Sequence, residues 1–105
     1  MNHFIYIIYS LKVDKYYIGE TECIQKRLEI HNSGTFKNSS TKTASDWQVV
    51  IAFIVNDRVE ARIIEKFIKA MKSRKFIESL VSDNNFYLNF IALVYKKYNI
   101  SILKY

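Results

Sequence analysis

Proline is absent from the chain, and cysteine occurs once, as Cys23. A single thiol cannot form a disulfide within the chain, and it cannot build a cysteine-rich zinc site. This cysteine usage indicates a reducing compartment, where we expect Cys23 to be a small core residue. No proline-rich linker, internal repeat or low-complexity tract divides the sequence. The 105 residues therefore fit one domain with a modest core and leave no room for a second domain.

Long apolar runs are also missing. The longest run extends from Val49 to Val55, which is far too short to span a bilayer. The N-terminal residues lack the basic stretch, the long apolar stretch and the small-residue cleavage site of a secretory signal. We therefore expect a soluble, cytoplasmic protein that does not associate with a membrane.

Apolar and basic residues are plentiful. Half of the residues are apolar and 15% are aromatic, which is typical of a packed globular domain and argues against disorder. The formal net charge is +6 and the isoelectric point is about 9.4. This balance favours polyanionic partners such as nucleic acid or an anionic surface, although solubility alone would also explain it.

The hydrophobic patterning predicts an α+β domain with a small, mostly antiparallel three-stranded sheet flanked by helices. Three strands are expected, at Phe4–Ser10, Lys15–Gly19 and Trp47–Val55, the last being central. Four helices are expected at residues 21–32, 57–72, 73–80 and 83–98, with capping by Thr21, Ser73 and either Ser82 or Asp83. Residues 35–46 are expected to form a long exposed loop, and residues 99–105 either an edge strand or a tail.

Two of the expected helices carry polar residues beside an apolar stripe. In the first helix, Arg27 and His31 lie one turn apart, next to the stripe formed by Ile24 and Leu28. In the helix at residues 57–72, Glu65 lies at the border between an apolar and a basic face, where its carboxylate can be partly buried and still reach a cleft. The apolar face comprises Ala61, Ile64, Phe67, Ile68 and Met71, and the basic face Arg58, Arg62, Lys66 and Lys69.

These residues occur in an order that resembles the GIY-YIG nuclease superfamily. The resemblance covers roughly residues 2–82 and is closest to the small stand-alone members, which are similar to the catalytic domain of the excision-repair endonuclease. Several motifs in the right order make it a specific signal. The matching segments are Phe4-Ile5-Tyr6, Tyr17-Ile18-Gly19, Gly19 through Asn32, Ala61 through Lys69, and Lys72 through Lys75.

The resemblance implies five catalytic residues and one divalent metal ion, Mg²⁺ or Mn²⁺. Glu65 would hold the metal, and a single carboxylate leaves the other coordination positions to water and phosphate oxygens. Arg27 would engage the phosphate as negative charge develops on it. Tyr6 is the favoured general base, with Tyr17 and His31 as alternatives.

The chain departs from the family pattern at two places. Phe4 replaces the leading glycine of the first motif but leaves Tyr6 in place, and Tyr9 competes for the same role. Many family members also supply a late asparagine to the site. Asn84, Asn85 and Asn89 are available here, and the sequence selects none of them.

We therefore expect a metal-dependent endonuclease that hydrolyses DNA and selects structure rather than sequence, because no element suits base-specific readout. The alternative is a non-catalytic nucleic-acid-binding accessory module of a repair or recombination assembly. The nuclease domain is expected at residues 2–82, with residues 83–105 as a helical extension packed on it that offers a surface for a homodimer or a partner protein. Expected DNA contacts are Lys26, Lys37, Lys42, Lys69, Lys72, Arg74 and Lys75.

Overall fold

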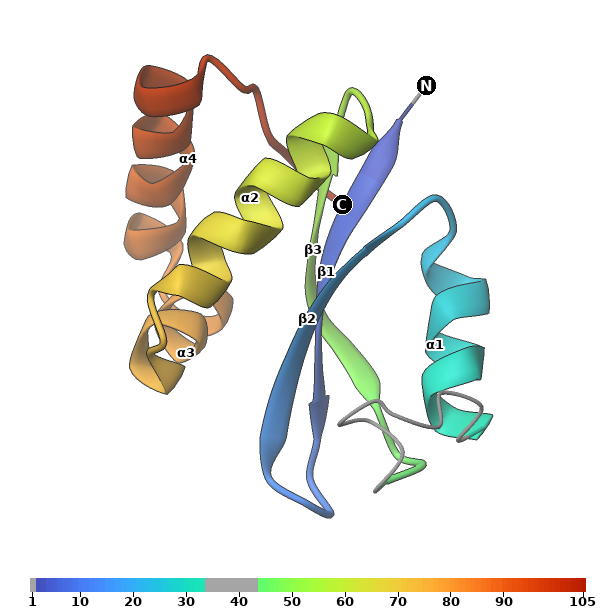
Figure 1. The fold of residues 1–105 in the computed structure, drawn as a ribbon. Coiled ribbons are helices and arrows are strands. Elements are labelled where there is room, and N and C mark those ends of the chain that lie inside the picture. The colour runs from blue at the N-terminus through green and yellow to red at the C-terminus, as the bar shows by residue number, and fades with distance from the viewer. Residues whose placement is uncertain (1, 34–43) are drawn as a thin grey trace.

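A four-stranded antiparallel sheet forms the centre of the computed structural model, which describes residues 2–33 and 44–105. The strand order is β2-β1-β3-β4 (Figure 1). The predicted α+β class and the antiparallel sheet are confirmed, but the expected count of three strands is wrong, because residues near the C-terminus pair with β3 as a short edge strand. The strands are β1 (His3–Ser10), β2 (Lys15–Thr21), β3 (Gln48–Val55) and β4 (Leu103–Lys104).

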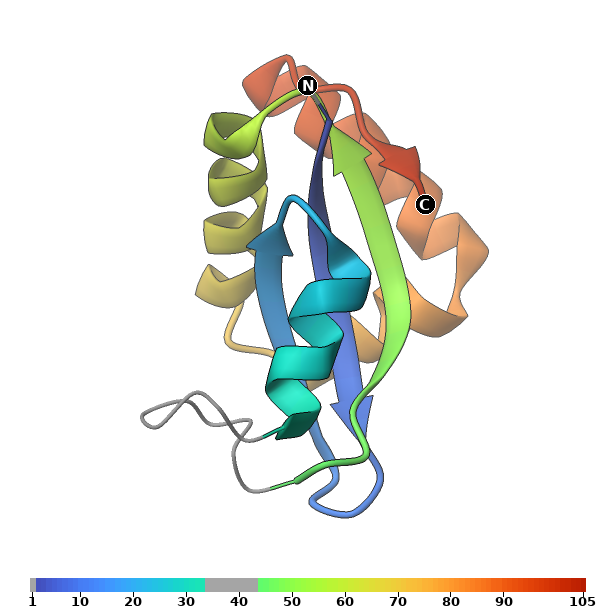
Figure 2. The same cartoon turned by 90° about the vertical axis from the view of Figure 1, so that its right-hand side faces the viewer.

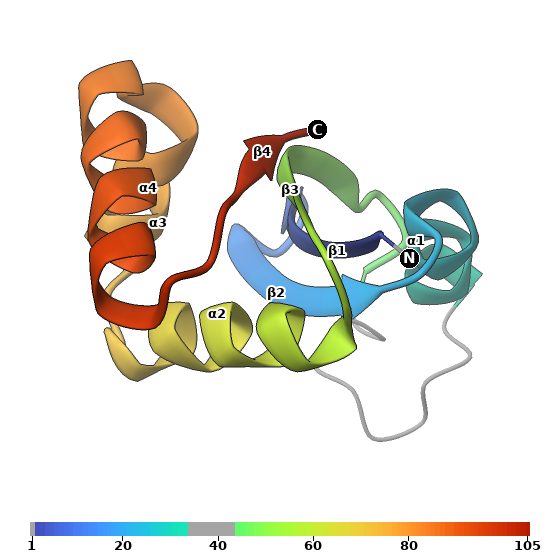
Figure 3. The same cartoon turned by 90° about the horizontal axis from the view of Figure 1, so that it is seen from above.

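Helices cover both faces of this sheet. Helix α1 (Ile24–Ser33) lies on one face, while α2 (Arg58–Ala70), α3 (Arg74–Ser82) and α4 (Asn84–Tyr98) lie on the other (Figures 2 and 3). In residues 2–33 and 44–105, no helix combines the length and the apolar character needed to cross a membrane.

Strand β1 is buried on both faces because it lies between these two layers. Its side chains alternate between two clusters, as the pleat of a strand requires. Ile5 and Ile7 belong to the larger cluster, which includes residues of α2, α3 and α4. Tyr6 and Ile8 belong to a smaller cluster under α1, with Trp47 and Ala52, against which Ile24 and Leu28 pack. The predicted apolar stripe of the first helix is therefore confirmed.

Most helix ends follow the local signals in the sequence. The Ser73 side chain accepts a hydrogen bond from the Phe76 backbone at the start of α3, and Asp83 caps α4 in the same way. The Thr21 cap is wrong, because Thr21 still pairs with Phe4 in the sheet and α1 begins only at Ile24.

Two side chains expected in the core are exposed. Cys23 lies at the solvent-facing start of α1, where Ile24 and Leu28 instead take the positions against the sheet. Met71 is exposed just after Ala70, the last residue of α2.

The end of α1 is fixed to the start of β3 by one side chain. The Asn32 amide donates to the Trp47 carbonyl oxygen over 3.1 Å, and the Trp47 backbone N–H donates to the Asn32 oxygen over 2.7 Å. These two bonds hold α1 against the sheet at the end that carries His31. The expected contact residues Lys37 and Lys42 lie outside the described residues.

Candidate active site

The phenol of Tyr6 extends from β1 across its neighbour β2. Tyr6 pairs with Gly19 in the sheet, and a Cβ atom at Gly19 would lie only 2.6 Å from Cζ of the Tyr6 ring. A side chain at this position cannot coexist with the ring as placed. Gly19 therefore allows the Tyr6 ring to cross β2. The Tyr6 hydroxyl then lies near β2, which is the edge strand of the sheet.

Three ring side chains meet at this edge. The Tyr6 hydroxyl lies 2.8 Å from Nε2 of His31, and both side chains are almost fully buried. The Tyr17 ring lies 4.8 Å from the His31 ring and 6.5 Å from the Tyr6 ring, measured between centroids. The structure thus brings together the two predicted tyrosines and the predicted histidine from β1, β2 and α1.

The pKa of Tyr6 shows which charges surround it. Burial raises this pKa well above the usual value, and the neighbouring Tyr17 raises it further. The Arg27 guanidinium lowers the Tyr6 pKa, while the carboxylates of Glu65 and Glu20 raise it. The hydroxyl therefore keeps its proton at neutral pH, within electrostatic reach of all the other predicted catalytic residues that carry charge.

The pKa of His31 is shifted in the opposite direction. Burial lowers it from 6.5 to about 4, and the positive charge of Arg27 contributes to the shift. His31 is therefore neutral at physiological pH. A neutral imidazole offers one ring nitrogen as an acceptor, so the protonated Tyr6 hydroxyl can donate to Nε2 while its own oxygen accepts a hydrogen bond from another group.

Glu65 approaches the same edge from α2. Its side chain is only partly exposed, and one carboxylate oxygen accepts a hydrogen bond from the Lys69 ammonium over 2.7 Å. The Lys69 ammonium also lies 5.7 Å from the centre of the Tyr17 ring. Residues one helical turn apart on α2 therefore present a carboxylate and a cation beside Tyr17.

Glu65 can offer one carboxylate oxygen to a metal ion, because the Lys69 hydrogen bond occupies only the other oxygen. Among residues 2–33 and 44–105, no three His, Cys, Asp or Glu side chains are close enough together to hold a metal ion. Mg²⁺ suits such a site, because it keeps several waters and takes phosphate oxygens from the substrate. Glu65 would hold the ion through the oxygen that does not receive the Lys69 hydrogen bond.

Arg27 lines a groove of about 410 Å³ that extends from α1 to Arg58 at the start of α2. Part of its wall is a cluster that the sequence analysis missed, in which His3 and Arg58 both bind the Glu20 carboxylate. Glu20 pairs with Ile5 in the sheet, which places it diagonally opposite His3. The sequence does show that His3 and Glu20 flank the two tyrosine motifs. Their proximity, however, depends on the register between β1 and β2, which the sequence does not show.

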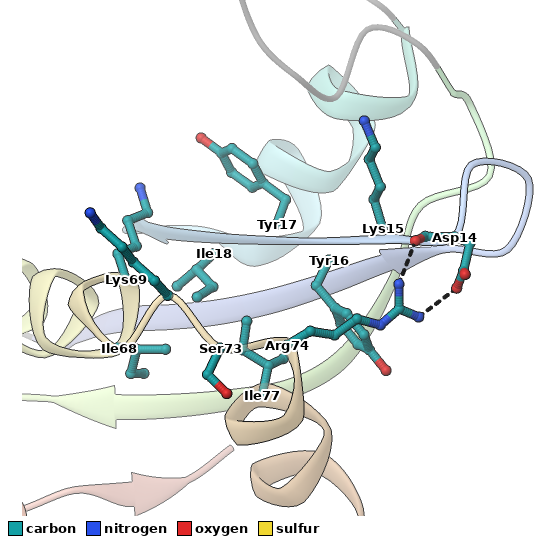
Figure 4. Close-up of a pocket in the computed structure, with 11 residues that line it drawn as sticks. Asp14, Lys15, Tyr16, Tyr17, Ile18, Ile68, Lys69, Ser73, Arg74 and Ile77 are labelled. Atoms are coloured by element: carbon teal, nitrogen blue, oxygen red, sulfur yellow. Dashed lines mark hydrogen bonds and ion pairs between the residues drawn. The ribbon is translucent and has the colours of Figure 1, made fainter.

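The predicted DNA contacts lie in different places around Tyr17. Lys69, Lys72 and Arg74 line a groove along β2 together with Lys15 (Figure 4). Lys26 shares the other groove with Arg27. Lys75 is exposed on α3.

The candidate asparagines remain unassigned. Asn84, Asn85 and Asn89 are exposed on α4, which covers the face of the sheet away from α1 (Figure 3). Glu65 of α2 shares this face with α4 whereas His31 of α1 does not, so the face alone selects none of the three.

The comparison with known proteins agrees with this arrangement. The sequence profile of the GIY-YIG catalytic domain matches residues 2–77, which contain all five predicted catalytic residues. No curated protein and no solved structure matches the chain significantly. The profile match covers most of the chain and indicates a nuclease-type function acting on DNA. The chain therefore belongs to the GIY-YIG family.

Proposed function

We propose that the protein is a metal-dependent endonuclease that hydrolyses DNA phosphodiester bonds. The observation that supports this proposal is the meeting of Tyr6, Tyr17 and His31 at the edge of β2, within electrostatic reach of Arg27 and Glu65. These groups come from two strands and two helices.

In this proposal, a water molecule attacks the phosphorus atom and the bond to the leaving oxygen breaks. The water gives its proton to the Tyr6 oxygen as the Tyr6 proton passes to Nε2 of His31, across the observed 2.8 Å contact. This relay avoids a free phenolate, which the raised pKa of Tyr6 makes unfavourable. The lowered pKa of His31 opposes its protonation in the free protein, so the step requires the bound phosphate to offset the positive charge of Arg27. Tyr6 thus serves as the immediate base and His31 as the final acceptor.

Two further residues act on the phosphate. Arg27 supplies donors to the non-bridging oxygens, where negative charge grows during the attack. Glu65 would hold one Mg²⁺ or Mn²⁺ ion, which supplies charge neutralisation at the leaving oxygen when bound. Tyr17 packs against the His31 ring and keeps its orientation.

The test is cleavage by the wild type and by Glu65→Gln, which preserves the size of the side chain but removes its charge. The substrates are supercoiled plasmid and labelled duplex, flap, junction and single-stranded DNA, each with Mg²⁺ or Mn²⁺. We expect the substitution to reduce cleavage by more than about 100-fold while DNA binding persists. Glu29→Gln, an exposed carboxylate of α1, is the matched control and should cleave as the wild type does.

Equal cleavage by Glu65→Gln and the wild type would reject the assigned role of Glu65. Binding of the same substrates without cleavage in either metal would instead favour the non-catalytic accessory module. The rates at which the wild type cleaves the different DNA substrates show whether it selects its substrate by DNA structure.

A further inference from the structure

A groove of about 600 Å³ runs along β2, between this strand and the junction of α2 and α3 (Figure 4). Its apolar lining comes from Ile18, Ile68 and Ile77. Cationic side chains also line it, including Lys15 and Lys72. A groove of this size corresponds to a site for a small organic ligand.

The groove joins the candidate active site. Tyr17 and Lys69 line it, and each also contacts a predicted catalytic residue. The Tyr17 ring lies 4.8 Å from the ring of His31, and the Lys69 ammonium lies 2.7 Å from the carboxylate of Glu65. A ligand in the groove therefore lies next to the proposed cleavage point.

At the far end of the groove, the charged side chains of Asp14 and Arg74 already form ion pairs within the protein. Arg74 donates to the Asp14 carboxylate over 2.6 Å and to the Asp14 carbonyl over 2.8 Å, while its Nε donates to Glu78 over 3.0 Å. These bonds tie the turn between β1 and β2 to α3. In the described part of the chain, Lys15 and Lys72 make no ion pair. Their charges are therefore available to a ligand.

The chemistry of the groove matches an unpaired nucleotide. Nucleic acid without a complementary strand offers an exposed base with apolar faces, attached to negatively charged phosphates. The partly exposed Ile77 and the Tyr16 ring can contact the base, and the lysines can bind the flanking phosphates. Within residues 2–33 and 44–105, β2 pairs with no strand other than β1, so its outer edge also presents backbone groups that can hydrogen-bond to the edge of a base. A base inside a duplex is stacked and paired, and cannot enter such a groove.

We propose that this groove receives an unpaired nucleotide of the substrate strand, next to the phosphate that is cleaved. The inference rests on the proposed nuclease function and gives its structural selectivity a physical origin. DNA with an extruded base, a flap or a single-stranded end places its backbone across Tyr17 and Lys69 while the free base occupies the groove. A continuous duplex gains only the contacts with the phosphate backbone.

The experiment measures binding without turnover, using Glu65→Gln in EDTA at fixed salt. Fluorescence anisotropy gives the dissociation constants for a fully paired duplex and for the same duplex with one unpaired nucleotide. Two variants are then made in this background. Lys72→Glu reverses an exposed charge on the groove, and Ile77→Trp fills the groove without changing charge. Lys96→Glu on α4 is the matched charge control.

We expect the Glu65→Gln protein to bind the DNA with the unpaired nucleotide about 10-fold more tightly than the duplex. Lys72→Glu and Ile77→Trp should reduce this ratio to within about 2-fold, whereas Lys96→Glu should preserve it. Circular dichroism confirms that each variant is folded. If Ile77→Trp does not fold, Lys72→Glu decides the outcome, because its side chain lies at the surface.

If the Glu65→Gln protein, with no substitution in the groove, binds the two DNAs with equal dissociation constants, this inference is overturned. An equal ratio in Lys72→Glu and Lys96→Glu would overturn it as well. Cleavage of both the fully paired duplex and the DNA with the unpaired nucleotide by the wild type in Mg²⁺ is measured separately. Cleavage without a binding preference removes the groove proposal and leaves the nuclease standing, whereas a preference without any cleavage removes the nuclease and leaves the groove.

Discussion

At the residue scale, the contact between Gly19 and Tyr6 explains why a glycine ends the second tyrosine motif. The ring of Tyr6 occupies the space above Gly19 and brings its hydroxyl to His31. The motif spacing predicts both residues, but the sequence does not show that one makes room for the other. That relation follows from the register, in which Tyr6 and Gly19 are direct partners across β1 and β2.

Gly19→Ala should therefore lower both stability and activity. A methyl group would overlap the Tyr6 ring, and the ring would have to move away from His31. We expect a loss of about 1–3 kcal/mol in the free energy of unfolding, as for other overpacked cores. Urea denaturation measures it. In a Tyr6→Ala background the same substitution should cost less than about 1 kcal/mol, and an unchanged cost there would contradict the overlap.

The lowered pKa of His31 predicts a pH-dependent stability. The unfolded chain binds the proton with the ordinary pKa of 6.5, whereas folded His31 binds it only near pH 4. Between these values the unfolded state binds more protons, so stability is complete above about pH 6.5 and falls as the pH drops towards 4. The shift corresponds to at most about 3 kcal/mol.

Urea denaturation of the wild type and of His31→Gln, at several values between pH 4 and 7, measures this effect. Glutamine does not titrate, so the stability difference between the two proteins should shrink steadily as the pH falls. A difference that stays constant across this range would show that His31 keeps its ordinary pKa. The carboxylates titrate in both proteins and cancel in the comparison.

At the element scale, the sequence predicts a helix start correctly when the signal is local. Ser73 and Asp83 each accept a backbone hydrogen bond within three residues, and short-range chemistry determines such a cap. Thr21 has the same local signal but is held by β1, so that strand pairing decides its conformation. The sequence likewise does not decide between an edge strand and a tail for residues 99–105, because β4 depends on a partner strand about fifty residues away.

The turn between α2 and α3 contains a strained residue. Lys72 has a φ of 48°, in the left-handed region that disfavours residues with a side chain. Lys72→Gly should therefore raise the free energy of unfolding by about 1 kcal/mol. Lys66→Gly, inside α2, should instead lower it by about 1 kcal/mol. Thermal or urea denaturation distinguishes the signs, and destabilisation by both substitutions would show that the turn is not strained.

At the scale of the whole molecule, the sequence predicts the site better than its surroundings. The two motifs and the two helices on which the sequence places Tyr6, Tyr17, His31 and Glu65 are present in the structure, and their side chains lie in one region. The cluster of His3, Glu20 and Arg58 and the groove along β2 were not predicted. They arise where elements distant in the sequence meet, and no local pattern encodes the register or the helix placement that joins them.

The segment after residue 82 has two different faces. Tyr87, Phe90 and Val94 of α4 lie in the same buried cluster as strand residues of the sheet. Leu88, Leu93 and Tyr95 are exposed large hydrophobic side chains on the same helix. The buried face ties α4 to the nuclease fold, while the exposed face is where the predicted homodimer or partner surface would form. That surface, the boundary at residue 82 and the cytoplasmic location remain predictions.

Phe90 provides the most direct measure of how far the fold depends on α4. Its ring is almost fully buried, with centroids 6.0 Å from Phe53 of β3, 6.1 Å from Phe67 of α2 and 6.0 Å from Phe76 of α3. It thus joins the sheet and three helices, although it lies beyond the family match at residues 2–77.

Phe90→Ala should therefore destabilise the whole protein by about 3–5 kcal/mol, the usual cost of removing a large buried aromatic side chain. Leu88→Ala, on the exposed face of the same helix, is the matched control and should change the stability by less than about 0.5 kcal/mol.

Urea denaturation is followed by circular dichroism for the whole fold and by the fluorescence of Trp47, which lies under α1 in the other cluster. Coincident transitions shifted together by Phe90→Ala would show a single cooperative unit. A loss of helix signal at low urea that leaves the Trp47 transition unchanged would show instead that α4 unfolds separately and that the nuclease fold does not require it.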